Sequence, residues 1–465
     1  MALELSNLTF TEQDDIVPTS GVEQILNTEV ANTLAGNDRI TGTGNDYGFE
    51  NLGVLNTDDG NDTITGIGSL PNTLDDFSYS IVNSGTLNTG EGNDIITGTS
   101  ESKGIVSYGT LNTAEGNDII TSSAYYDGLH NYGTLNTGEG NDIVTSTSFY
   151  NGLLNSGTLN TGEGNDIITG TGLYDGLHNY GTLNTGEGND VITGDGRGRG
   201  IYSSEGSIFD TGDGNDIIRA NNRGGINNSS NTFTTGDGND TIDGGAGDYP
   251  GIYNEGLINT GNGEDYIISR GLLINYGGVF LGEGNDSIIA DKYFPGHDLE
   301  NFNFIGTGDG NDIITSPDAI YNEGVIETGN GDDSIIVDGG VNGTGEGYGI
   351  YNNGGAINMG DGNDFISANE GFESAENSSG AWFLGEGEDY IKGFGSGDFY
   401  GGNGNDTLEL TPGTYTVGIW GEAGESPIFT KGDQLMITSE FEKLKAGSTI
   451  YDFTSLTAGQ IIVVA

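Results

Sequence analysis

Residues 127–150 read Asp-Gly-Leu-His-Asn-Tyr-Gly-Thr-Leu-Asn-Thr-Gly-Glu-Gly-Asn-Asp-Ile-Val-Thr-Ser-Thr-Ser-Phe-Tyr, and the first sixteen of them recur identically at 175–190. Within this stretch, glycine-x-glycine-x-aspartate with an aliphatic residue two positions later is one of sixteen such phrases, some with a glycine replaced. The commonest step between their aspartates is 24 residues. A fixed period of this size predicts one supersecondary unit per repeat, stacked on its neighbours around a continuous core. The sixteen aspartates are Asp38, Asp62, Asp94, Asp118, Asp142, Asp166, Asp190, Asp216, Asp240, Asp265, Asp286, Asp312, Asp333, Asp364, Asp389 and Asp406.

Two apolar columns indicate which side chains point inward. The residue two positions after each motif aspartate is aliphatic in every repeat, whereas the residue one position after it is mixed, as at Arg39 and Thr63. Because successive side chains of a strand face opposite sides, the first column predicts core and the second predicts surface. Seven residues before the aspartate a further column is large and apolar, with Leu135, Phe209 and Trp382 as examples.

A third strand per repeat carries an inward asparagine, such as Asn131 and Asn155, which we expect to form a hydrogen-bonded ladder along the axis. Together these columns predict an all-β fold: a right-handed parallel β-helix, or β-roll-like solenoid, of three short strands and about 24 residues per coil.

The repeats also suggest the domain limits. Residues 1–30 lack the turn motif and suit an N-terminal cap strand, and residues 31–409 hold the repeats. After Asp389 the step shortens to 17 residues, and 410–465 has strand-like runs without a repeat. We therefore predict a C-terminal β cap over residues 410–465.

Composition excludes several classes of function. The chain has 70 acidic and 12 basic residues, a net charge of −58, so nucleic acid and anionic lipid surfaces are not expected partners. It has no cysteine, which rules out disulfides and thiolate chemistry. No apolar run approaches the ~18 residues of a membrane span. The acidic N-terminus also lacks the features of a cleaved signal peptide, so we expect either a cytosolic protein or export by another route.

The repeated turn has the chemistry of a calcium site. Calcium takes six to eight oxygen ligands, and glycines let backbone carbonyls turn toward one centre while the aspartate adds carboxylate oxygen. One turn supplies too few ligands, so we expect the ions to lie between coils, in a single row.

At these residues the chain resembles the repeats-in-toxin, or haemolysin-type, calcium-binding proteins, whose nonapeptide is Gly-Gly-x-Gly-x-Asp-x-aliphatic-x. The resemblance covers about residues 31–409. The chain departs from this pattern in three ways. The first glycine of the nonapeptide is usually threonine, as at Thr137 and Thr161, and each coil has one such turn where the family has two. Leu34 and Ala35 stand before Asp38 where glycine is expected. The metal ligands expected from the motif are Asp62, Gly90, Gly92, Asp94, Gly116, Asp118, Gly138, Gly140, Asp142, Gly162, Gly164, Asp166, Gly186, Gly188, Asp190, Gly212, Gly214, Asp216, Gly236, Gly238, Asp240, Gly261, Gly263, Asp265, Gly282, Gly284, Asp286, Gly308, Gly310, Asp312, Gly329, Gly331, Asp333, Gly360, Gly362, Asp364, Gly385, Gly387, Asp389, Gly402, Gly404 and Asp406.

The resemblance implies a location and a way of folding. Members of this family leave the cell by a type I secretion channel that reads an uncleaved C-terminal signal. This chain, with its end Ile461-Ile462-Val463-Val464-Ala465, looks similar. Binding of several Ca2+ ions outside the cell would then drive folding. We expect a secreted or cell-surface structural or adhesive protein.

Other functions are weighed against this one. The histidines His130 and His178 share one phase on the outward side, which repeat duplication explains better than catalysis, so we expect no enzyme activity. A polysaccharide-acting β-helix enzyme is the less favoured alternative, because the few bases, such as Arg197 and Arg199, are expected to balance local acid. Outward Thr and Asn on five consecutive coils, such as Thr134 and Thr158, resemble an ice-binding face and give the alternative function, although a column of glutamates lies nearby. Outward tyrosines in the variable loops suit either cell-surface glycans or self-association.

Overall fold

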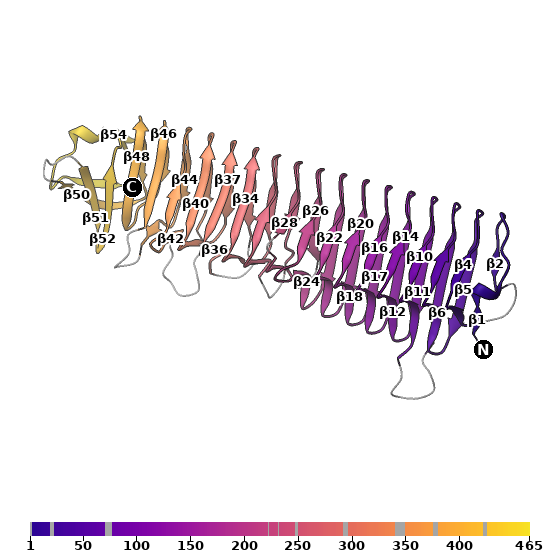
Figure 1. Ribbon diagram of the computed structural model, residues 1–465. Helices are drawn as coiled ribbons and strands as arrows, with labels where there is room; N and C mark the ends of the chain where they lie inside the picture. The colour runs from indigo at the N-terminus through magenta and orange to yellow at the C-terminus, as the bar shows by residue number, and fades with distance from the viewer. Residues whose placement is uncertain are drawn as a thin grey trace. The chain divides into compact units, whose positions relative to one another are not determined.

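The structure of the protein is a computed structural model, and it describes residues 2–18, 23–69, 77–221, 223–230, 232–246, 250–291, 296–339, 349–374, 380–421 and 426–465. The chain divides into two compact units, Met1–Tyr249 and Pro250–Ala465. Each is built almost entirely of short β-strands, and the described residues contain only two short 3-10 turns, η1 (Leu5–Asn7) and η2 (Phe453–Ser455). Within each unit, equivalent strands of successive coils lie side by side (Figure 1).

The first unit contains three parallel ladders of strands, here called sheets A, B and C. Sheet A contains β1 (Leu3–Glu4), β3 (Ile25–Asn27), β6 (Tyr47–Asn51), β9 (Tyr79–Asn83), β12 (Lys103–Ser107), β15 (Asp127–Asn131), β18 (Asn151–Asn155), β21 (Asp175–Asn179), β24 (Arg199–Ser203) and β27 (Ile226–Asn228). Sheet B contains β2 (Ile16–Val17), β5 (Arg39–Gly44), β8 (Thr63–Gly68), β11 (Ile95–Ser100), β14 (Ile119–Ala124), β17 (Ile143–Ser148), β20 (Ile167–Gly172), β23 (Val191–Gly196), β26 (Ile217–Asn221) and β29 (Thr241–Asp243). Sheet C contains β4 (Val30–Asn32), β7 (Val54–Asn56), β10 (Thr86–Asn88), β13 (Thr110–Asn112), β16 (Thr134–Asn136), β19 (Thr158–Asn160), β22 (Thr182–Asn184), β25 (Ile208–Asp210) and β28 (Thr232–Thr234).

The second unit repeats the arrangement. Its sheet A contains β30 (Ile252–Asn254), β33 (Leu273–Asn275), β36 (Leu299–Asn301), β39 (Ile320–Asn322), β42 (Ile350–Asn352) and β45 (Phe372–Glu373). Its sheet B contains β32 (Tyr266–Ser269), β35 (Ser287–Ala290), β38 (Ile313–Ser316), β41 (Ser334–Val337), β44 (Phe365–Ala368), β47 (Tyr390–Lys392), β49 (Thr407–Leu410), β53 (Lys443–Ala446) and β54 (Thr449–Asp452). Its sheet C contains β31 (Leu257–Asn259), β34 (Gly278–Glu283), β37 (Phe304–Asp309), β40 (Val325–Asn330), β43 (Ala356–Asn358), β46 (Ala381–Gly387), β48 (Gly397–Gly404), β50 (Gly413–Trp420), β51 (Ser426–Lys431), β52 (Gln434–Ser439) and β55 (Ile461–Val464).

Register follows the sequence period. Where the step is 24 residues, each residue pairs with the residue 24 positions on, as Leu135 does with Leu159 in sheet C and Val144 with Ile168 in sheet B. The fold predicted from the period, an all-β parallel solenoid with three strands per coil, is therefore confirmed.

The core consists of the predicted columns. All sixteen aliphatic residues two positions after the motif aspartates are buried. The apolar column seven positions before the aspartates is buried as well. The inward asparagines are also buried and bond one another: Asn131 Nδ2 donates to Asn155 Oδ1 at 2.9 Å, and Asn155 Nδ2 donates to Asn179 Oδ1 at 2.8 Å. This confirms the predicted asparagine ladder, which satisfies polar groups that burial would otherwise leave unpaired.

Pairing changes character near the C-terminus. β50 pairs antiparallel with β51 and with β55, β51 with β52, and β53 with β54. β52 and β53 also continue the parallel ladders by pairing with β48 and β49. Antiparallel hairpins thus cover the last parallel strands of the second unit. The limits of the three segments expected from sequence stay predictions.

Candidate metal centre: a ladder of buried aspartates

The motif turns connect the strands of sheet C to those of sheet B. In one coil, Gly138 to Asp142 lie between β16 and β17. The strand that follows carries Val144 into the core, which fixes the turn at the edge of the coil. Every one of the sixteen motif aspartates is buried, with at most 2% of its surface exposed.

The two motif glycines of this turn have backbone conformations that side chains disfavour. Gly138 has φ +101° and Gly140 has φ +151°. A Cβ built on Gly140 would lie 1.6 Å from the carbonyl oxygen of Gly116 in the preceding coil. The carbonyl oxygens of the glycines therefore project along the axis toward the next coil, which is where the sequence predicted carbonyl ligands.

Three of the described turns keep this geometry without a glycine four positions before the aspartate, the place that Gly138 takes before Asp142. Leu34, Asp58 and Ala114 occupy that position with φ of +69°, +58° and +66°. A left-handed conformation costs an L-residue roughly 1–2 kcal/mol. The surrounding coils thus impose the turn even where the motif is incomplete.

The aspartates form a hydrogen-bonded ladder from coil to coil. The backbone N–H of Asp118 donates to Oδ1 of Asp142 at 2.7 Å, and the N–H of Asp142 donates to Oδ1 of Asp166 at 2.7 Å. The same link joins Asp265 to Asp286 and continues to Asp406 in the second unit. One carboxylate oxygen per coil is therefore committed to holding its neighbour.

The other carboxylate oxygen is left without a donor. Each Oδ2 is enclosed in the turn and makes no hydrogen bond at the following described aspartates: Asp38, Asp62, Asp94, Asp118, Asp142, Asp166, Asp190, Asp216, Asp286, Asp312, Asp333, Asp364, Asp389 and Asp406. A buried, unpartnered carboxylate oxygen is destabilising when ionised, and in coil after coil it is an oxygen that a cation could bind.

Burial acts on the acidity of these carboxyls. Desolvation raises the pKa of Asp118 to about 7, although the Thr113 hydroxyl and the Asp94 N–H lower it in part. The pKa of Asp166 is raised to about 7 and that of Asp94 to about 6, again chiefly by desolvation. The ionised form of the ladder is therefore unfavourable unless a positive charge lies beside it.

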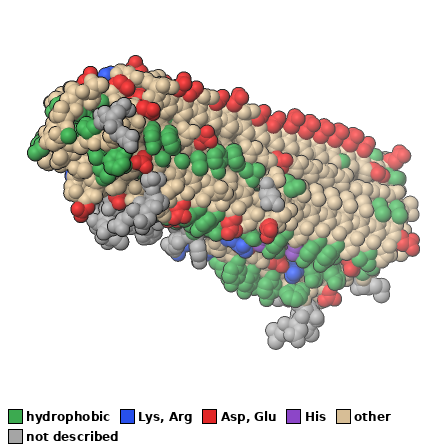
Figure 2. Space-filling model, turned by 60° about the vertical axis from the view of Figure 1, so that its left-hand side comes forward, with side chains coloured by type: hydrophobic (Ala, Val, Ile, Leu, Met, Phe, Trp, Pro, Cys, Tyr) green, Lys and Arg blue, Asp and Glu red, His purple; other side chains and the backbone are tan. Residues whose placement is uncertain are grey.

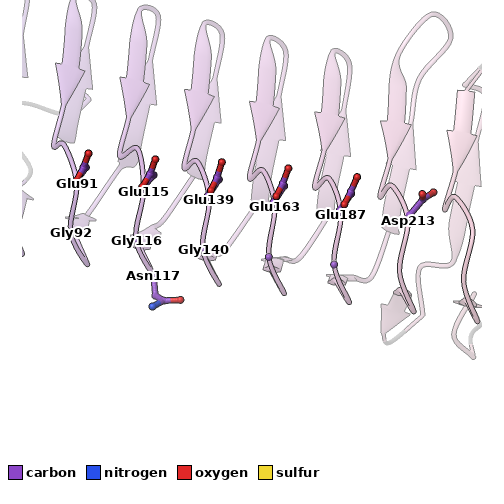
Figure 3. Close-up of a pocket in the computed structure, with 12 residues that line it drawn as sticks. Glu91, Gly92, Glu115, Gly116, Asn117, Glu139, Gly140, Glu163, Glu187 and Asp213 are labelled. Carbon is purple, nitrogen blue, oxygen red and sulfur yellow. The ribbon is translucent and has the colours of Figure 1, made fainter.

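A row of exposed carboxylates flanks the turns. In six successive coils the residue three positions before the motif aspartate is acidic and projects outward, and these side chains border an open groove of about 970 Å3 (Figure 3). Acidic side chains form a close row along the right-hand part of the upper edge of the face shown in Figure 2. The groove's acidic residues are Glu91, Glu115, Glu139, Glu163, Glu187 and Asp213.

Two residues at the ends of the ladder were not predicted from sequence. The N–H of Asp15 donates to Oδ1 of Asp38 at 2.7 Å, and Glu442 Oε2 accepts the N–H of Asp406 at 2.7 Å. Neither has the motif glycines. The available signal was a buried aliphatic residue two positions later, Val17 or Leu444.

The ladder does not form a dense carboxylate cage. Among the described residues, no three or more His, Asp or Glu side chains lie close enough together to hold a metal ion. The structure brings each predicted site aspartate beside its motif glycines and the glycines of the adjacent coil. Any ion there would need backbone carbonyls as ligands in addition to carboxylate.

His178 of β21 is covered although its strand neighbours Leu177 and Asn179 take the inward positions. Only 3% of its surface is exposed. Its Nδ1 lies 3.2 Å from Asp175, and its ring stacks on Tyr180 with the centroids 3.7 Å apart. Arg199 holds the same carboxylate at 2.9 Å. The outward position was inferred from strand alternation alone, which cannot show that neighbouring aromatic side chains cover the ring.

The outward Thr and Asn columns lie in register. Thr134 pairs with Thr158, and Asn136 pairs with Asn160, in adjacent strands of sheet C. The asparagine side chains bond along the column, Asn160 Nδ2 donating to Asn136 Oδ1 at 2.7 Å. This face is therefore regular over several coils of the first unit.

Comparisons with known proteins add little. No protein-family model and no curated protein matches the chain. One similar solved structure is an X-ray crystal structure of a hyperactive, Ca2+-dependent, β-helical antifreeze protein from an Antarctic bacterium. The two are 21% identical, the match covers 77% of this chain and 84% of that chain, and the TM-score is 0.37. In the described part of the chain, no helix is long and apolar enough to cross a membrane.

Proposed function

We propose that this protein is a secreted or cell-surface structural solenoid whose folding depends on a row of calcium ions bound at the aspartate turns. The observation that carries the proposal is the buried Oδ2 atom that recurs without a hydrogen bond in successive coils. Calcium prefers oxygen ligands and combines carboxylate with backbone carbonyl oxygen readily. It would supply the positive charge that the buried ladder lacks.

The residues that would hold the ions are the motif aspartates and the glycines two and four positions before them. In the turn of Asp142 these are Gly140 and Gly138, with carbonyls that project toward the next coil. The chain's net charge of −58 adds a second reason, since each bound dication offsets two negative charges.

Calcium titration of calcium-free protein tests the proposal. The expected result is a rise in β-sheet circular dichroism and in melting temperature as calcium increases to the millimolar range, because a ligand that binds only the folded state stabilises it. Magnesium is the control cation, since it demands a smaller octahedral site and keeps its waters. A protein equally folded and equally stable with and without calcium would refute the proposal.

Secretion through a C-terminal signal and a non-catalytic role belong to the same proposal. Support for the first comes from calcium-coupled folding, which would keep the chain unfolded for export where calcium is scarce. Fractionation of the producing cells tests the location, and recovery of the protein only from the cytosol would contradict it.

Ice binding is a second candidate, favoured by the in-register outward column that contains Thr134 and Thr158. It predicts thermal hysteresis by the calcium-loaded protein, abolished when these threonines are replaced by tyrosine without unfolding. The neighbouring glutamate row would hold water in charged shells, so we rank this candidate below the structural one. A hysteresis gap at micromolar protein would reverse that order.

A further inference from the structure

A column of side chains at another corner of the first unit is apolar in its middle and oppositely charged at its two ends. The residues recur every 24 positions: Glu101, Tyr125, Phe149, Leu173 and Arg197. Backbone bonds keep the last four in line, since the N–H of Phe149 donates to the Tyr125 carbonyl at 3.0 Å, and the N–H groups of Leu173 and Arg197 each donate to the preceding member at 3.1 Å. One residue further on, the N–H of Tyr126 donates to the Ser102 carbonyl at 2.8 Å, which sets the coil of Glu101 beside that of Tyr125.

A second column runs beside the first and is formed by tyrosines. Tyr126, Tyr150 and Tyr174 stack in succession with centroids 5.3 Å apart and ring planes 18° from parallel. The first column stacks likewise, with Tyr125 and Phe149 centroids 5.0 Å apart. Tyr125, Phe149 and Tyr174 are 45%, 48% and 54% exposed. Together the two columns form an aromatic patch, and Figure 2 shows a band of hydrophobic side chains along the lower edge of the face drawn.

The charges around this aromatic patch are nearly balanced, unlike those of the whole chain. The two columns carry one acid, Glu101, and one base, Arg197, at opposite ends. Of the acids next to the patch, Asp127 pairs with Lys103 at 3.2 Å and Asp175 with Arg199 at 2.9 Å, and Asp195 lies two residues before Arg197. On a protein of net charge −58, this is a face where a like-charged molecule can approach without strong repulsion.

We propose that the aromatic patch binds a second copy of the same chain, in an antiparallel arrangement about a two-fold axis that passes by Phe149. Phe149 is the middle member of the first column. A two-fold axis there brings Phe149 against its own copy, Tyr125 against Leu173, and Glu101 against Arg197. An isologous contact needs a self-complementary surface, and the opposite charges at the two ends provide one.

The spacing of the rings also favours a second copy. The rows repeat at the coil spacing of ~4.8 Å, so the rings of an identical array match them over the full ~19 Å between Glu101 and Arg197. Sugar rings prefer to lie flat on an open aromatic face, whereas here the faces are turned toward one another along each column. A stack of ring edges suits interdigitation with another such stack.

Sedimentation of the full chain in millimolar calcium tests the proposal, from about 1 to 200 μM protein, the range in which a small interface dissociates. The wild type is expected to form a dimer that dissociates on dilution. Phe149→Asp places two like charges at the axis and should raise the dimer dissociation constant at least about tenfold. Tyr132→Asp, at a similarly exposed tyrosine outside the patch (45%), is the matched control and should leave dimerisation unchanged.

Exchange of the end charges gives the sharper result. Glu101→Arg and Arg197→Glu each set like charges opposite one another and should weaken the dimer, whereas the double variant restores opposite charges and should restore it. Circular dichroism in calcium checks that every variant is folded. A monomeric wild type over the whole range, or a double variant as weak as the single ones, overturns the proposal. So does binding of a neutral polysaccharide that depends on Phe149 in a protein that never dimerises.

Discussion

Glu442 completes the ladder for Asp406: its Oε2 accepts the Asp406 N–H at 2.7 Å, as a motif aspartate does for the coil before it. The match extends to the core, because Leu444 pairs with Leu408 two positions further on. The C-terminal hairpins therefore supply the acceptor that a missing next coil would have provided.

Glu442→Ala should open this end of the second unit. The Asp406 N–H loses its acceptor, and a buried donor without a partner costs about 1–3 kcal/mol. Amide hydrogen exchange in calcium is the measurement, with faster exchange expected at Asp406 and unchanged exchange at Asp364. Glu440→Gln is the control, since Glu440 is exposed. Equal protection of Asp406 in all three proteins would show that Glu442 does not close the ladder.

Asp142→Asn tests the two oxygens of one motif carboxylate separately. Asparagine keeps an Oδ1 acceptor for the Asp118 N–H but replaces the unpartnered oxygen with an amide. Calcium-free protein should be no less stable than the wild type, whereas calcium bound at this turn should weaken by about tenfold or more as the ligand charge is lost.

Calorimetric titration and ion counting by native mass spectrometry check this result. Glu139→Gln removes one charge from the exposed row in the same turn and should leave the ion count unchanged. If both substitutions reduce calcium binding equally, the effect is general electrostatics and the buried ladder is not the site.

Calcium-free protein should become less stable as pH rises from 5 to 8. Burial raises the folded-state pKa of Asp62, Asp118 and Asp166 to about 7, against an ordinary value of 3.8. Between these values the folded state binds more protons than the unfolded state, so its stability is greatest at low pH and falls through pH 7. Calcium needs the ionised carboxylates and should reduce or reverse the trend.

Melting temperatures in calcium-depleted and millimolar-calcium buffers measure this dependence. A double variant, Asp142→Asn with Asp166→Asn, should show a shallower decline without calcium because it has fewer titrating groups. A melting temperature that rises with pH in the absence of calcium contradicts the expectation.

Asn155→Leu should destabilise the first unit by about 3 kcal/mol, because it leaves the buried Asn179 Oδ1 and the Thr182 carbonyl without their donor. Asn160→Leu is the matched control in the outward column, where water can replace the lost bond and less than about 1 kcal/mol is expected. Urea unfolding in calcium compares the two. If the two variants lose similar free energy of unfolding, the inward asparagine ladder contributes no more to stability than the outward column.

The solenoid could be predicted from the sequence because each inward column, such as that of Val144, recurs at the same position of every repeat. The repeat period therefore also indicates which residues form the core. It did not predict Asp15 or Glu442, which join the ladder by bonds between a backbone N–H and a carboxylate but lack the motif glycines. The left-handed backbone of Ala114 and the burial of His178 were also not predicted. Both depend on the coils stacked on either side, and no local sequence pattern indicates them.

The buried links of the ladder share one direction. The Asp118 N–H, the Asn131 amide and the Thr137 hydroxyl each donate to an acceptor in the coil that follows in the chain. A stack that grows backward from its last coil thus gives every added coil its buried acceptors at once. In a stack that grows forward, the coil added last has these donors buried without acceptors until the next coil is added. These three links taken by themselves therefore favour assembly of the first unit from its C-terminal coils toward its N-terminal ones.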